Sequence, residues 1–250
     1  VDARGRIVER DLRVEIAAGI VVADPVAVRV VDHQRRVSGR DRRDDQRQAS
    51  RTEIEADGPM SFARFMELAL YHPEWGYYET EAGRVGRGGD FVTSVSVGVA
   101  FGQLLASRFA EWFGGIDSPV RIVEAGAHDG TLARDILEWL NEHYKPLCEL
   151  LTYTIIEPSA KRREWQAKRL AKFGERVEWF CSLSDAPEIR GVIFSNELLD
   201  AFPVHRIGWS QAKRDWFEWC VACEAGSFCW AKADANQATW RELLPAWPSA

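Results

Sequence analysis

The sequence predicts an α/β fold built on a parallel, Rossmann-like sheet, and two observations support this. Residues 120–125 form an apolar run typical of a buried parallel strand; a glycine turn and a helical pattern follow, with Thr131 as the expected cap. Two later apolar or β-branched runs, 151–157 and 191–197, each reach an acidic residue at the end. Strand, glycine turn and helix in this order are typical of a nucleotide-binding βαβ unit. The apolar positions of the expected helix are Leu132, Ile136, Leu137 and Leu140.

The turn itself indicates which ligand to expect. It lacks the G-x-G-x-x-G pattern of dinucleotide sites, and Glu124 ends the strand two residues before Gly126. This arrangement resembles the first motif of class I S-adenosylmethionine-dependent methyltransferases. The resemblance implies that Glu124, Gly126, Ala127 and Gly130 bind the methionine part of the cofactor. Another nucleotide, or a turn needed only for packing, remains an alternative.

Composition restricts the other possibilities. The net charge of −6 gives no argument for broad nucleic-acid binding, and no apolar run is long enough to cross a bilayer. Five cysteines without a signal-peptide pattern favour a reducing, cytoplasmic compartment. Residues 1–50 contain no aromatic side chain and no lysine, so we expect this segment to be disordered or not native to the domain. A solvated charged tail is the alternative.

The predicted organisation therefore has three parts: the segment 1–50, a helical lead-in with a cofactor-covering loop over 51–118, and the cofactor-binding core over 119–250. In the lead-in, Ser61 is the expected cap of a helix that ends at His72-Pro73. A further helix is expected from about 98 to 113. The apolar face of the first helix is predicted to comprise Phe62, Phe65, Met66, Ala69 and Leu70.

Residues 65–78, the run Gly-Asp-Phe-Val-Thr-Ser at 89–94, and Phe101-Gly102 resemble the MidA family. This is a group of class I methyltransferases whose mitochondrial member is a complex I assembly factor and protein arginine methyltransferase. The resemblance implies S-adenosyl-L-methionine as cofactor, a protein substrate such as a respiratory complex I subunit, and a mitochondrial location in a eukaryote. It also implies that four loop residues lie near the cofactor: Gly89, Asp90, Phe91 and Thr93.

Two positions depart from the family pattern. Residues 95–98 read Val-Ser-Val-Gly where the family has Pro-Glu-Ile-Ser, which removes an acidic group. His128 replaces the middle glycine of the turn, and at a positive φ this would cost about 1 kcal/mol or more. A role for His128 as a catalytic base is an alternative to a packing or capping role.

The run 151–157 is predicted to be the second strand. Glu157 at its end is the expected acceptor for the ribose hydroxyls, and capping of the next helix is the alternative role. Residues 161–173 are expected to form a basic, solvent-facing helix. Residues 176–183 are the third predicted strand, and Asp185 after them is a candidate for contact with the adenine amino group.

The stretch 191–204 joins an apolar strand to Asn-Glu-x-x-Asp-Ala-x-Pro and matches the family. Strand carboxyl ends face the ligand crevice in open α/β sheets, so we expect Asn196, Glu197 and Asp200 where the methyl acceptor binds. Carboxylates at this place suit an arginine acceptor, with Glu197 as the first candidate. Acidic residues favoured by a helix N-terminus are the alternative.

A tryptophan-rich segment follows, and 215–230 is predicted to form a β-hairpin that turns at 224–226. Cys220 and Cys223 would point to opposite faces of a strand, so no metal site is predicted. The family continues beyond Ala250, so we expect an incomplete class I methyltransferase sheet whose fourth strand has an exposed edge.

The leading functional prediction is an S-adenosylmethionine-dependent methyltransferase acting on a protein arginine. The first alternative is a non-catalytic assembly or binding protein that keeps the cofactor fold, which His128 and the incomplete sheet favour. The second alternative is a nicotinamide oxidoreductase, which the absent G-x-G-x-x-G disfavours. The sequence predicts no oligomeric state.

Overall fold

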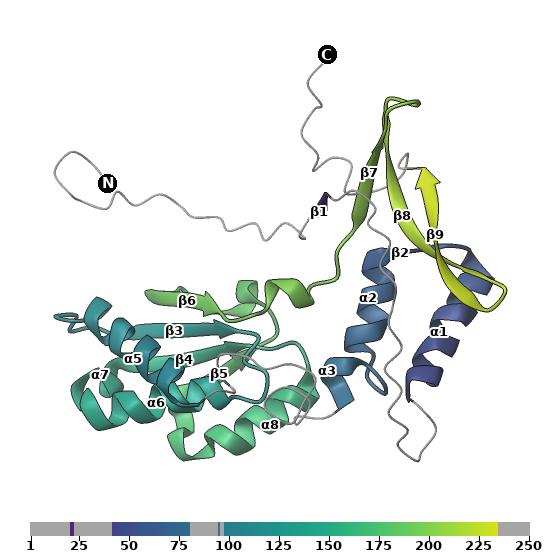
Figure 1. The fold of residues 1–250 in the computed structure, drawn as a ribbon. Helices are drawn as coiled ribbons and strands as arrows, with labels where there is room; N and C mark the ends of the chain where they lie inside the picture. The colour runs from purple at the N-terminus through teal and green to yellow at the C-terminus, as the bar shows by residue number, and fades with distance from the viewer. Residues whose placement is uncertain (1–20, 23–41, 81–94, 96–97, 235–250) are drawn as a thin grey trace. The chain divides into compact units, whose positions relative to one another are not determined.

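The computed structural model describes residues 21–22, 42–80, 95 and 98–234 (Figure 1). The chain divides into two compact units, and we describe each by itself. Of the described residues, the larger unit contains 42–52, 66–80, 95 and 98–202, whereas the smaller contains 21–22, 53–65 and 203–234. This division differs from the three predicted ranges because strand pairing joins part of the predicted lead-in to the C-terminal hairpin.

The larger unit is built on a parallel sheet of four strands in the order β5-β4-β3-β6. This confirms the predicted α/β, Rossmann-like class. Figure 1 shows the four arrows running in the same direction, with the helices of this unit packed beside them. The strands are β3 (Val120–Ala125), β4 (Leu151–Ile156), β5 (Val177–Phe180) and β6 (Gly191–Ser195).

One face of this sheet forms the hydrophobic core. Ile122, Tyr153 and Ile155 occur at alternating positions on their strands and are fully buried against the helices. All four apolar positions predicted for the helix after β3 are buried as well. The helices and 3-10 turns of this unit are α3 (Tyr77–Thr80), α5 (Ala100–Trp112), α6 (Thr131–His143), α7 (Lys145–Leu150), α8 (Ala160–Leu170), η1 (Ala171–Arg176), η2 (Leu183–Asp185) and η3 (Leu199–Ala201).

The opposite face of the sheet carries polar groups. Arg121 donates to the Thr154 hydroxyl at 2.6 Å, and that hydroxyl donates to Glu178 at 2.7 Å. Arg121 and Glu178 also form an ion pair. At the end of the strand order, β6 pairs only with β3 among the described strands, and Ile193 is 49% exposed. An exposed edge with apolar surface was predicted for this strand.

Helix α2 (Phe62–Tyr71) lies within the predicted lead-in, and its boundaries and buried face can be compared with the sequence prediction. It begins after Ser61, whose Oγ accepts a hydrogen bond from the Arg64 amide at 3.1 Å, and it ends before His72. Both boundaries confirm the prediction. The buried residue of the helix is Leu68, which the predicted apolar face omitted.

Helix α1 (Arg42–Asp57) corrects the prediction for the end of the first fifty residues. Positions 42–50 are helical, and Ser50 is buried. The charge-rich stretch contains good helix formers such as arginine, glutamine and alanine, which a reading based on aromatic content overlooks. Residues 1–20 and 23–41 lie outside the described part of the chain.

The smaller unit is a sheet in the order β1-β7-β8-β2, with β9 also paired to β8. The predicted hairpin is confirmed: Ala225 and Gly226 between β8 and β9 both have positive φ, 47° and 77°, as a type I′ turn requires. No described helix has the length and apolar character needed to cross a membrane. The strands are β1 (Val21–Val22), β2 (Met60–Ser61), β7 (Arg206–Ser210), β8 (Asp215–Glu224) and β9 (Ser227–Asp234).

Candidate functional site

The carboxyl ends of all four parallel strands lie in register at one edge of the larger sheet. Ala125 of β3 pairs with Ile156 of β4 on one side and with Ser195 of β6 on the other, and Ile156 pairs with Phe180 of β5. The residues that follow each strand therefore lie at the same edge. This edge brings together three parts of the predicted site: the glycine turn, Glu157 and the loop that starts at Asn196.

The turn after β3 requires left-handed backbone at three places. Gly126, His128 and Gly130 have φ of 75°, 48° and 80°. His128 therefore occupies the strained conformation that the sequence comparison with the family suggested. The predicted cap is wrong in one respect: Thr131 is the first helical residue of α6, and the Asp129 carboxylate accepts from its amide at 3.0 Å.

Asp129 is firmly ionised in this turn. Its carboxylate also accepts from Arg169 at 2.8 Å. Although burial acts to raise the pKa of Asp129, hydrogen bonds from His128 and Thr131 and the charge of Arg169 lower it to about 2. The turn is thus fixed by a charged cap at the start of α6, where the helix dipole favours a negative charge.

The glycine turn is in contact with the loop that follows β6. A Cβ placed on Gly126 would lie 2.6 Å from the Cδ1 atom of Leu198, so a larger residue would displace this leucine. The predicted cofactor turn and the predicted acceptor loop therefore pack directly against each other. Leu198 was not predicted to have a role, because an apolar residue inside a polar motif carries no sequence signal of its own.

Glu124 is buried beneath the turn. Its Oε2 accepts a hydrogen bond from the Tyr153 hydroxyl at 2.7 Å, and the residue is 2% exposed. Burial raises the pKa of Glu124 from 4.5 to about 7; the Tyr153 hydrogen bond opposes this shift and the nearby Asp129 adds to it. The carboxyl group is consequently poised to change charge near neutral pH.

Glu157 follows β4 and is also buried, at 1% exposure. Its Oε1 accepts from the Ser159 amide and from the Arg162 Nε, both at 3.0 Å. Its Oε2 accepts from Gln166 at 3.2 Å. The bond to Ser159 corresponds to the alternative reading of Glu157 as a cap of the next helix, and the bond to Arg162 adds an ion pair.

Arg162 corrects the prediction that the helix after β4 simply faces solvent. Its side chain is about 10% exposed, and its guanidinium lies between Glu157 and Glu79, with 3.7 Å from Nη2 to the Glu79 Oε1. Glu79 of α3 is itself buried and accepts from the Ser159 hydroxyl at 2.8 Å. A basic residue one turn into a helix can thus face inward when two carboxylates converge on it.

The acceptor loop after β6 contains a residue with left-handed backbone, and it is hydrogen-bonded to Tyr71 at Ala201. Glu197 has a φ of 50°, which is uncommon for a residue with a side chain. Burial raises the pKa of Tyr71 to about 12, so its hydroxyl stays protonated, and it donates to the Ala201 carbonyl at 2.7 Å. Asp200 lies close enough to Tyr71 and Tyr78 to raise the pKa of both phenols, although burial is the larger cause.

The remaining predicted residues are those at 89–93 and Asp185. Gly89, Asp90, Phe91 and Thr93 belong to the segment 81–94, which is not described. Asp185 accepts from the Ser182 amide at 3.1 Å and so caps the short turn η2.

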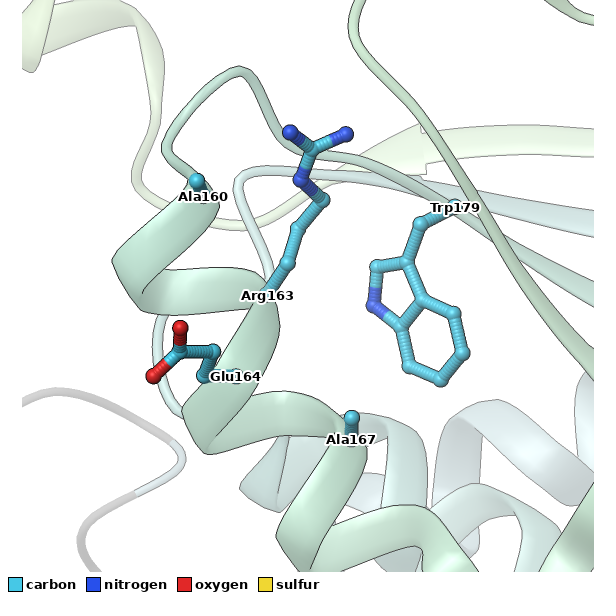
Figure 2. A pocket seen from close by; sticks show the side chains of 5 residues that line it. All are labelled: Ala160, Arg163, Glu164, Ala167 and Trp179. Atoms are coloured by element: carbon cyan, nitrogen blue, oxygen red, sulfur yellow. The ribbon is translucent and has the colours of Figure 1, made fainter.

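A shallow, open pocket lies between α8 and β5 (Figure 2). Figure 2 shows the Trp179 ring on the strand facing the helix, with Arg163 and Ala167 beside it. None of the lining residues belongs to the predicted site, and the wall offers few polar atoms, so we do not assign the cofactor to it. The lining residues are Ala160, Arg163, Glu164, Ala167 and Trp179.

Metal-type ligands do not gather in the described residues: no group of three or more His, Cys, Asp or Glu side chains could hold an ion there. Cys220 is buried on β8, and burial raises the pKa of its thiol to about 11. Such a thiol is a poor nucleophile and metal ligand near neutral pH.

A family model described as "Putative S-adenosyl-L-methionine-dependent methyltransferase" matches residues 104–250, more than half of the chain. This chain belongs to that methyltransferase family. The match agrees with the MidA resemblance, and it includes the glycine turn, Glu157 and the loop after β6.

Relatives of this methyltransferase family support the same assignment. The mitochondrial protein arginine methyltransferase NDUFAF7 of Mus musculus is 32% identical over 189 residues, covering 66% of this chain and 42% of that protein. The Danio rerio protein of the same name is 30% identical over 191 residues, covering 66% and 45%. The chain thus spans less than half the length of these two curated relatives.

A solved structure is similar as well. A COG1565 superfamily member from Burkholderia thailandensis, bound to S-adenosyl-homocysteine, aligns with a TM-score of 0.66 and 32% identity. The alignment covers 81% of this chain and 54% of that one. A second structure of a COG1565 protein from the same organism aligns with a TM-score of 0.62. These alignments confirm the predicted fold class.

The strain at His128 has a measurable consequence. We expect the His128→Gly variant to be more stable than the His128→Ala variant by about 1 kcal/mol, because only glycine adopts this positive φ without a Cβ clash. Both variants lose the imidazole, so their difference reports the backbone alone. Urea unfolding measures it, and equal stabilities of the two variants would show that the turn is not strained.

Burial of Glu124 predicts a pH dependence of stability. The unfolded state releases this proton near pH 4.5 and the folded state near pH 7, so the free energy of unfolding falls by roughly 3 kcal/mol between these values. Glu124→Gln removes this loss, so the variant should gain stability relative to the unaltered protein as the pH rises. Unfolding at pH 4.5, 6 and 7.5 tests this, with the exposed Glu142→Gln as control; a constant difference would contradict it.

Proposed function

We propose that this chain binds S-adenosyl-L-methionine at the carboxyl edge of its parallel sheet and serves in the methylation of a protein arginine. The observation that carries the proposal is the register of β3 with β4, which places the glycine turn beside Glu157. The similar COG1565 protein binds S-adenosyl-homocysteine, the product left when that cofactor gives up its methyl group. The activity of the whole protein is part of this proposal.

The residues present fit such a ligand. The Glu157 carboxylate is paired with Arg162, and its Oε2 accepts one hydrogen bond among the described residues, which leaves accepting capacity for a ribose hydroxyl. Glu124 lies on β3 two residues before Gly126, and its carboxylate would favour the ammonium of the methionine part. By family resemblance, Gly126, Ala127 and Gly130 contribute backbone contacts, and the loop residues Gly89, Asp90, Phe91 and Thr93 lie over the cofactor.

The protein's contribution to catalysis would be orientation. The cofactor supplies an activated methyl group, and the acceptor nitrogen must approach it in line. Holding both reactants in place can lower the barrier by about 7–11 kcal/mol. Asn196, Glu197 and Asp200 follow β6 at the same edge, so they are our candidates for binding the acceptor. A guanidinium suits carboxylates, because it donates in a planar fork.

The identity of the acceptor comes from relatives. The curated relatives are named as protein arginine methyltransferases of mitochondria, so a protein substrate and, in a eukaryotic cell, a mitochondrial location are proposed for this chain. These names do not support the predicted cytoplasmic location. That the substrate is a respiratory complex I subunit rests on the MidA resemblance alone.

A non-catalytic assembly protein is the second candidate, and His128 in the glycine turn is the observation that favours it. Such a protein would keep the fold and could bind the cofactor without transferring a methyl group. A nicotinamide enzyme has no such support, because the turn lacks the dinucleotide pattern.

Calorimetry with S-adenosylmethionine, S-adenosylhomocysteine and NAD tests the cofactor class on the 250-residue chain. We expect micromolar binding of the two adenosyl ligands and none of NAD. A folded chain, shown by a cooperative thermal transition, that binds neither adenosyl ligand would overturn the proposal.

Glu157→Gln should weaken S-adenosylhomocysteine binding about 10-fold or more, because a hydrogen bond to a charged acceptor is replaced by one to a neutral amide. Glu164→Gln on the exposed side of α8 is the matched control, and it should leave the affinity unchanged. Calorimetry measures both. An unchanged affinity of the Glu157 variant would instead favour the capping role.

Glu197→Gln should reduce methyl transfer to arginine by about 10-fold or more and leave S-adenosylhomocysteine affinity within about twofold, because it removes one charged contact to the acceptor. Incorporation of labelled methyl groups into an extract of the source cells, followed by methylarginine analysis, measures the transfer by the unaltered protein and by the variant. Equal activity of both proteins would exclude Glu197 from the acceptor site. No transfer by the unaltered protein would favour the assembly role.

A further inference from the structure

The hydrogen bonds and the ion pair of Glu157 determine which of its carboxylate oxygens could accept a hydrogen bond from a ligand. Oε1 accepts from Ser159, from the Arg162 Nε at 3.0 Å and from the Arg162 Nη2 at 2.9 Å, so its accepting capacity is used. Oε2 accepts only from Gln166 among the described residues. The carboxylate is therefore fixed in rotation, and a single oxygen remains for a further donor.

Arg162 fixes the orientation of the Glu157 carboxylate. The guanidinium contacts Glu157 on one side and Glu79 on the other, and its central carbon lies 5.7 Å from the centre of the Tyr71 ring. Tyr71 in turn stacks on Tyr78, at 5.6 Å between ring centres. Two carboxylates and an aromatic face thus enclose one buried cation, which leaves it little freedom to move.

The residues that enclose Arg162 come from distant parts of the chain. Tyr71 ends α2 and Glu79 lies in α3, whereas Glu157 follows β4. Glu79 adds a second link by accepting from the Ser159 hydroxyl, next to the start of α8. Residues 71–79 are thus attached to the end of β4 through Arg162.

We propose that Arg162 is a positioning residue for cofactor binding: it orients the Glu157 carboxylate so that Oε2 accepts a ribose hydroxyl. The inference rests on the proposed function and adds to it a residue that does not touch the ligand. Arg162 acts through Glu157, and Tyr71 and Glu79 hold Arg162 in place. Its effect on binding therefore depends on the ribose hydroxyls of the ligand.

A double cycle that combines variants of Arg162 with a ligand lacking the ribose hydroxyls tests the positioning role of Arg162. Calorimetry compares S-adenosylhomocysteine with its 2′,3′-dideoxy form, which lacks the hydroxyls that Glu157 would bind. Arg162→Met should weaken the parent ligand about 10-fold or more and the dideoxy ligand by less than about twofold. Lys168→Met, at an exposed position of α8, is the control and should change neither affinity.

Loss of a buried cation leaves Glu157 unpaired and can unfold the Met variant, so Arg162→Lys is the second variant. It keeps the charge but not the planar fork, and it should give an intermediate loss for the parent ligand and none for the dideoxy ligand. Equal losses for both ligands would overturn the inference and leave the proposed function standing. Failure of the unaltered, folded chain to bind S-adenosylhomocysteine would overturn both.

Discussion

The register of four parallel strands brings the glycine turn, Glu157 and the loop after β6 to one place. Because β3, β4, β5 and β6 end in line, each strand delivers the residues that follow it to the same edge of the sheet. Helices pack against the face that carries Ile122, Tyr153 and Ile155, and the polar network of Arg121, Thr154 and Glu178 lies on the other face. Binding at such an edge needs no cavity inside the core, which agrees with the crevice rule for open α/β sheets.

Strain and buried charge gather at this edge. His128 and Glu197 both adopt left-handed backbone without being glycine, and the loops that contain them meet where Leu198 packs on Gly126. Residues in such conformations are stable only when their surroundings hold them, and they are common at functional sites. Glu124 shares this edge, and burial is the largest cause of its raised pKa, to which the charge of Asp129 adds.

Glu157 and Glu124 are both buried, but their partners differ: Glu157 forms an ion pair with Arg162, whereas Glu124 accepts a hydrogen bond from the neutral Tyr153 hydroxyl. Arg162 forms ion pairs with two buried carboxylates, Glu157 and Glu79, and is itself buried. Removing one member of such a cluster is costly because the others remain buried without their partner. The cluster also connects α2 and α3 to the end of β4, so that the part of the chain before the core contributes to the geometry of the core.

The sequence by itself determined the α/β class, the strands β3 and β4 to within one residue at their carboxyl ends, the boundaries of α2 and the hairpin turn. These features follow from local rules: alternation, helical spacing, caps and glycine conformations. Tertiary structure decided which side chains face inward. The sequence pattern predicted that the helix containing Arg162 faces solvent, but in the folded chain Arg162 contacts Glu79 and Tyr71. The composition of residues 42–50 predicted disorder, but these residues are helical. Contacts between residues 80 positions apart, such as Glu79 with Ser159, leave no periodic signal, so only the folded chain reveals them.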